Sequence, residues 1–171
     1  MLLSWQDSLA QRLKSKRTDS NRLPRICLIG IGNDLRGDDS AGLIVARELL
    51  ADKHFFSKPN LLIIEGGSAP ENHTGKLRSF QPELVLFIDA AHLDEPPGAI
   101  RWIPLESIDG MSASSHSLPL SILARYISSE FGCQVEVLGI QPVQNELGTE
   151  LTLPVRTAVE EIVRQMSNLF A

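Results

Sequence analysis

The segment from Gly30 to Gly42, GIGNDLRGDDSAG, contains three carboxylates directly after an apolar run. That run, residues 26–29, is continuous rather than alternating, which is typical of a short buried strand. A glycine turn and a helical pattern follow, and in many α/β proteins the start of such a helix binds a phosphate. Here this place holds Asp38 and Asp39, whose negative charges would repel a phosphate. Either an Asp caps the helix, which this stretch alone favours, or one Asp binds a metal cation.

Other polar side chains occupy comparable positions. Glu65 ends the run LLIIE, Asp89 ends LVLFID, and His116 directly precedes a helical pattern. Ligands of open α/β sheets bind beyond the carboxyl ends of the strands, so we expect Asp39, Asp89 and His116 to lie together. Two carboxylates and an imidazole suit a divalent metal such as Ni²⁺, Zn²⁺, Mn²⁺ or Fe²⁺, and three protein ligands leave positions for water or substrate. Such a metal could polarise a carbonyl group for hydrolysis.

The spacing by itself leaves other interpretations open. Asp89 could be a solvated strand terminus or a helix cap, and His116 could be a hydrogen-bonded loop residue. The chain contains no HExxH, G-x-S-x-G or P-loop signature. Gly30 and Gly32 begin a dinucleotide fingerprint, but Leu35 stands where the third glycine belongs. A divalent-metal-dependent hydrolase and a non-enzymatic nucleotide- or flavin-binding module are therefore both open interpretations of these residues.

The elements that would position these side chains alternate along the chain. Strand-like runs lie at 25–31, 61–65, 84–89, 100–103 and 134–140, and helical patterns lie at 39–51, 117–130 and 154–169. This alternation predicts an α/β fold, a three-layer α/β/α sandwich whose mostly parallel, five-stranded sheet carries helices on both faces. The gap before the fourth run is short for a parallel crossover, so we expect an antiparallel fourth strand and a mixed sheet.

Length and patterning predict one domain with an extension. We expect residues 1–22 to form an N-terminal helix and linker, and residues 23–171 to form a single domain. The helix carries one apolar stripe, formed by Leu2, Trp5, Leu9 and Leu13. We expect this stripe to pack on the domain's own surface.

Composition excludes several classes of protein. The net charge of −5 argues against a nucleic-acid partner. No apolar run approaches the roughly 20 residues that a membrane span needs. Two cysteines, Cys27 and Cys133, are too few for a disulfide framework and lie in or beside strand patterns. They are interpreted as buried thiols of a cytoplasmic protein.

Five pieces of the chain together resemble a known family. GIGNDLRGDDSAG, EGGSAPEN, LFIDAAH, SSHSLPL and LGIQP occur in an order and spacing similar to those of the [NiFe] hydrogenase maturation endopeptidases, from about residue 25 to the C-terminus. The likeness is greatest to the hydrogenase 3 (formate hydrogenlyase) type. It implies a five-stranded sheet between helices. It also implies an aspartic-type or metal-dependent endopeptidase that removes the C-terminal peptide of the hydrogenase large-subunit precursor after nickel insertion.

The resemblance also implies roles for single residues. Carried over one by one, Asp39, Asp89 and His116 are the nickel-contacting and catalytic set. Glu65, Gly66 and Gly67, which open EGGSAPEN, are assigned to substrate binding. The family usually has Asp at the position of Glu65, which keeps the charge but reaches one methylene further. Nickel is expected to arrive with the precursor, which is the expected protein partner.

Overall fold

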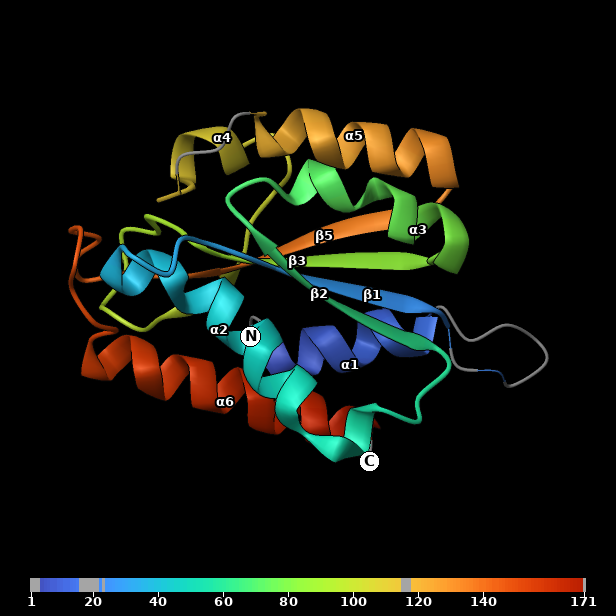
Figure 1. Cartoon of the computed structure of the whole chain (residues 1–171), viewed down its shortest axis with the longest axis horizontal. Coiled ribbons are helices and arrows are strands. Elements are labelled where there is room, and N and C mark those ends of the chain that lie inside the picture. The colour runs from blue at the N-terminus through green and yellow to red at the C-terminus, as the bar shows by residue number, and fades with distance from the viewer. Residues whose placement is uncertain (1–3, 16–21, 23, 115–117, 171) are drawn as a thin grey trace.

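A computed structural model describes residues 4–15, 22, 24–114 and 118–170. Its five strands form one sheet in the order β2-β1-β3-β5-β4 (Figure 1). The strands are β1 (Ile26–Ile31), β2 (Leu61–Gly67), β3 (Leu84–Ala90), β4 (Ile100–Trp102) and β5 (Gln134–Ile140). β1, β2, β3 and β5 pair in parallel, and β4 runs antiparallel to β5. The predicted mixed sheet, with its reversed fourth strand, is therefore confirmed.

Helices cover both faces of this sheet. One face carries α2 (Ala41–Ala51) and α6 (Leu153–Phe170), and the other carries α3 (Thr74–Phe80) and α5 (Leu120–Phe131) (Figure 1). Short elements complete the chain: α1 (Trp5–Ser15), η1 (Gly37–Ser40), η2 (Lys53–Phe55), η3 (Pro70–His73) and α4 (Ile108–Met111). The three-layer α/β/α sandwich is confirmed.

The central strands are apolar on both faces because both faces are covered. Along β3, Leu84, Leu86 and Ile88 belong to the core beneath α2 and α6. Val85 and Phe87 belong to the core beneath α3 and α5. Every residue of β1 and β3 is buried, so their sequences are continuous apolar runs instead of alternating ones.

The first helix packs on the domain through Trp5 and Leu9 of the predicted stripe, whereas Leu2 and the side chain of Leu13 lie outside the part of the chain that the structure describes. Leu9 is 1% exposed and joins the core beneath α6. Trp102 of β4 donates its indole N–H to the carbonyl oxygen of Trp5 at 3.3 Å. The guanidinium of Arg12 lies 4.6 Å from the ring centre of Trp102 and also pairs with Glu136 of β5. α1 thus extends the helical layer over the β4 edge of the sheet.

Some boundaries differ from the sequence prediction. The residues GDDS form the 3₁₀ turn η1, and α2 begins only at Ala41. α5 begins at Leu120, later than the predicted helical pattern at 117–130, and Pro119 is its extended N-cap residue. β2 continues through both glycines of EGG. The sequence did not predict the short helices α3 and α4, because neither has a clear helical periodicity of apolar residues. Within the described residues, no helix has the length and apolarity needed to cross a membrane.

Candidate active site

Two buried carboxylates meet at the carboxyl edge of the sheet. Asp39 lies in η1, the first helical turn after β1, and Asp89 is near the end of β3, the neighbouring strand. β1 and β3 flank the point where the strand order reverses, which is where open α/β sheets bind ligands. Asp39 is 3% exposed and Asp89 is 1% exposed. The structure therefore brings these two predicted site residues together.

One hydroxyl group joins the two acids. Ser114 Oγ donates to Asp39 Oδ1 in a short hydrogen bond and lies 2.7 Å from Asp89 Oδ1. Ser112 Oγ donates to the other oxygen of Asp89, Oδ2, at 2.7 Å. The Oδ1 atoms of Asp39 and Asp89 thus converge on one point, so both can approach a single small partner. A pair of convergent carboxylates fits a divalent cation.

Backbone pairing holds the serine segment against β3. Ala113 donates its N–H to the carbonyl oxygen of Ala90 at 2.9 Å, and His92 donates to Met111 at 2.7 Å. Beyond the serines, Asp109 of α4 accepts the backbone N–H of Ser121 at 3.0 Å, near the start of α5. The Ser121 hydroxyl also donates to the Asp109 carboxylate. This side-chain hydrogen bond, and then the backbone one, lower the pKa of the Asp109 carboxyl.

His116 lies outside the described residues, so its place in the site stays a prediction. Among residues 4–15, 22, 24–114 and 118–170, no three His, Cys, Asp or Glu side chains gather to hold a metal ion. Of the predicted metal-binding set, the structure describes only the pair Asp39 and Asp89, and the third predicted ligand is His116. Sequence reasoning missed Ser112 and Ser114. The serine-rich piece SASSHS beside His116 was the available signal.

Asp38 does not cap the helix. Its buried carboxylate accepts the backbone N–H groups of Val143 at 2.8 Å, Gln144 at 3.2 Å and Thr152 at 2.7 Å, and the Thr152 hydroxyl at 2.9 Å. The start of η1 has no side-chain cap hydrogen bond. The capping interpretation was therefore wrong for Asp38, because this carboxylate instead joins η1 to the segment between β5 and α6.

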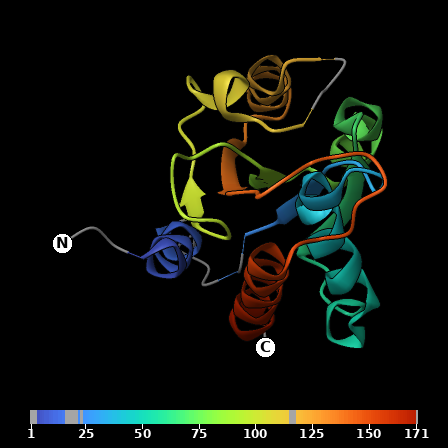
Figure 2. The ribbon, with the colours of Figure 1, turned by 90° about the vertical axis from the view of Figure 1, so that its left-hand side faces the viewer.

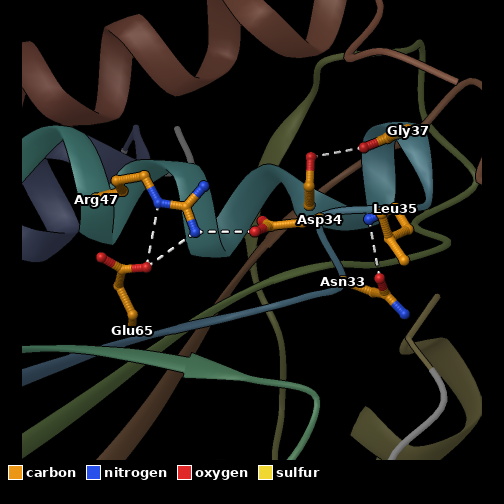
Figure 3. Close-up of polar contacts among 7 residues, drawn as sticks. Asn33, Asp34, Leu35, Gly37, Arg47 and Glu65 are labelled. Carbon is orange, nitrogen blue, oxygen red and sulfur yellow. Dashed lines mark hydrogen bonds and ion pairs between the residues drawn. The ribbon is translucent and has the colours of Figure 1, made fainter. Parts of the chain in front are cut away.

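Glu65 lies on the same rim but turns toward α2 (Figure 3). Its Oε2 accepts from Arg47 Nε at 3.1 Å and from Arg47 Nη2 at 2.9 Å. Arg47 Nη2 also donates to Asp34 Oδ2 at 3.0 Å, and the hydrogen bonds that Asp34 and Glu65 accept raise the pKa of Arg47 above its usual value. The predicted role of Glu65 in substrate binding stays a prediction, and its observed partner is Arg47.

Gly66 and Gly67, the two glycines after Glu65, are each required for a different structural reason. A Cβ on Gly66 would lie 2.7 Å from Cγ2 of Ile29, so only glycine lets β2 pass β1 this closely. Gly67 has φ of +60°, and its carbonyl oxygen accepts the N–H of Gly32 at 3.1 Å. Their substrate-binding assignment stays a prediction.

Comparison with known proteins identifies the class of protein to which this chain belongs. The family model of the hydrogenase maturation protease HycI matches residues 44–169. The chain belongs to the hydrogenase maturation protease family. The match covers most of the domain but begins after the GDD turn that carries Asp39.

Within this family, the proteins similar to this chain include hydrogenase 3 maturation proteases. The hydrogenase 3 maturation protease of Escherichia coli K12 is 34% identical over 140 residues, which are 81% of this chain and 86% of that protein. The crystal structure of the [NiFe] hydrogenase maturation protease HycI from Thermococcus kodakarensis KOD1 superposes with a TM-score of 0.79 at 34% identity. The superposition covers 95% of this chain and 98% of the Thermococcus chain. The solution structure of the Escherichia coli endopeptidase HycI gives a TM-score of 0.71 at 33% identity, over 84% and 89% of the two chains.

Proposed function

We propose that this protease cuts the C-terminal peptide from a [NiFe] hydrogenase large-subunit precursor after nickel has been inserted. The meeting of Asp39 and Asp89 at one hydroxyl group carries this proposal. Two buried carboxylates whose oxygens converge on one point form a place where a cation held by the precursor could dock. The names of the similar proteins support hydrogenase as the substrate.

Nickel is treated as part of the substrate. Asp39, Asp89 and His116 would contact it when the loaded precursor binds, and the precursor would hold it through its own side chains. When bound, nickel would supply Lewis-acid polarisation of a nearby carbonyl. An empty precursor would leave the site incomplete, so cleavage would report nickel loading.

The acid pair would also move protons during hydrolysis. Water would attack the carbonyl carbon of the peptide bond and give one proton to a carboxylate of the pair. The C–N bond would then break, and the departing amine would take up a proton. This assigns the enzyme to the aspartic-type, metal-dependent proteases. The thiols of Cys27 and Cys133 are both buried, which is compatible with the reducing cytoplasm as the location of the protein.

The experiment combines the purified protein with precursor that either holds or lacks nickel. Mass spectrometry of the large subunit then detects loss of the C-terminal peptide. We expect cleavage only of the nickel-loaded precursor. Equal cleavage of both forms would overturn nickel gating, and tight nickel binding by the protease alone would contradict delivery by the substrate.

Variants test the residues of the set. Asp39→Asn and His116→Ala should leave the precursor uncut. His54→Ala is the matched control, because this exposed histidine lies in η2, beyond the far end of α2. Normal processing by His116→Ala would remove that residue from the site.

A further inference from the structure

Exposed apolar side chains concentrate on two segments beside the acid pair. Seven large hydrophobic residues are exposed in the described part of the chain, and three of them are Leu35, Val143 and Leu147. Leu35 lies between β1 and η1, and the other two lie between β5 and α6. Single exposed apolar residues are normal on a protein surface, but a group at one rim indicates an interaction.

Hydrogen bonds join the two segments into one surface. Gly148 donates its N–H to the carbonyl oxygen of Leu35 at 2.7 Å, and Gly37 donates to Thr149 at 3.1 Å. Figure 2, which shows the carboxyl edge of the sheet, places segment 141–152 (orange to red) beside the start of α2 (blue). The buried Asp38 carboxylate fixes the backbone of this segment at Val143. Leu35, Val143 and Leu147 are therefore held in place before any partner arrives.

The surface is continuous with the acid pair. Asp38, which anchors Val143, directly precedes Asp39 in η1. On the other side, Asn145 Nδ2 donates to the carbonyl oxygen of Ala113, one residue before the Ser114 that joins the acids. The exposed residues of these segments therefore lie close to any peptide bond that reaches Asp39.

We infer that Leu35, Val143 and Leu147 form the docking surface for the hydrogenase precursor, and that they contact apolar side chains next to the peptide bond to be cut. This inference rests on the proposed function. The pre-formed surface would bind the precursor and align its C-terminal segment over Asp39 and Asp89. The energy of burying these side chains would appear mainly as affinity for the precursor.

The first test measures the steady-state kinetics of precursor cleavage. The double variant Leu35→Ser with Leu147→Ser should raise KM by about tenfold or more, with a smaller effect on kcat, because it removes two apolar side chains that the bound precursor would bury. Phe56→Ser is the matched control, since Phe56 is 71% exposed and lies next to η2, away from the acid pair. It should leave KM within about twofold of the wild-type value. An unchanged KM for the double variant would overturn the docking surface.

The second test detects contact directly. A photoreactive maleimide is attached to the cysteine introduced by Leu147→Cys. The native Cys27 and Cys133 are both buried and so compete little for the label. Illumination with nickel-loaded precursor should yield a cross-linked product containing a large-subunit peptide, and Phe56→Cys should yield none. Cross-links from Phe56→Cys alone, or cross-links that join two copies of the protease, would contradict the inference. If the wild-type chain cleaves no precursor, the proposed function itself fails, whereas normal cleavage with a failed cross-link removes only the docking surface.

Discussion

Ser114 is the side chain that joins the two acids of the site. Its hydroxyl lies within hydrogen-bond distance of Asp39 and of Asp89, yet it carries one proton and can donate fully to only one of them at a time. Both acids are almost fully buried, so water contributes little to holding them in position. Ser114 therefore acts as a positioning residue for the pair.

We expect Ser114→Ala to slow precursor cleavage by about tenfold to a hundredfold. A hydrogen bond to a charged group contributes about 1.5–3 kcal/mol, which corresponds to that range of rates. Mass spectrometry of the large subunit gives the rate, and Ser114→Thr, which keeps the hydroxyl, should recover part of it. Ser79→Ala, which removes an exposed hydroxyl on α3, is the control. Wild-type kinetics in Ser114→Ala would exclude a positioning role.

Cys27 should make the protein less stable at alkaline pH. Burial raises the pKa of its thiol well above the usual value, and the nearby Cys133 adds to this effect. The thiol stays neutral in the folded chain but ionises in the unfolded chain near pH 8.5. Its contribution to stability is therefore complete below about pH 8.5 and is lost as the pH rises further.

The free energy of unfolding should fall above pH 8.5 by up to about 1.4 kcal/mol per pH unit from this group. Urea unfolding between pH 7 and 10 measures the slope. Cys27→Ala should be less stable at pH 7 but should show a shallower decline. Identical slopes in the two proteins would mean that Cys27 does not titrate in this way.

At the scale of elements, α2 lies unusually close to the sheet where Asp39 is positioned. A Cβ on Gly42, in the first turn of α2, would lie 2.0 Å from the carbonyl oxygen of Ile88 and 2.6 Å from that of Ile31. Both neighbours are backbone atoms of the central strands and cannot rotate away. The close approach of α2 to β1 and β3 therefore determines where η1 and its acids lie.

Gly42→Ala should force α2 away from the sheet and destabilise the fold by about 2 kcal/mol or more, by analogy with overpacked cores. It should also slow precursor cleavage, because η1 moves with the helix. Gly75→Ala is the matched control: Gly75 lies in α3 with no atom within 4 Å of an added Cβ, and it should stabilise the protein slightly. Thermal unfolding of both variants checks the prediction. Equal melting temperatures for Gly42→Ala and Gly75→Ala would contradict it.

At the scale of the whole molecule, one carboxylate links segments that are more than 100 residues apart. Asp38 follows the first strand, and Val143 and Thr152 follow the last. These hydrogen bonds hold the segment between β5 and α6 against η1, at the rim that holds the acid pair. The proposed docking surface and the acid pair are therefore coupled through Asp38.

Asp38→Ala should lower the free energy of unfolding by about 3 kcal/mol. The reason is that buried N–H groups of Val143 and Thr152 lose a charged acceptor, and each loss costs about 1–3 kcal/mol. The same variant should impair precursor cleavage through the displaced segment. Denaturant unfolding measures the loss, and Glu160→Ala, on an exposed position of α6, should change stability by less than about 0.5 kcal/mol. A stability equal to wild type would show that the segment is held by other contacts.

The sequence by itself determined the layers, the reversed fourth strand and the placement of Asp39 and Asp89 at one sheet edge. These follow from local patterns, since continuous apolar runs mark strands covered on both faces and parallel strands end at the same edge. The tertiary structure alone decided that Ser114 joins the two acids, that Asp38 holds a segment 105 residues away, and that Glu65 pairs with Arg47. Such contacts depend on ångström-scale distances between elements remote in the chain, and no local periodicity encodes those distances.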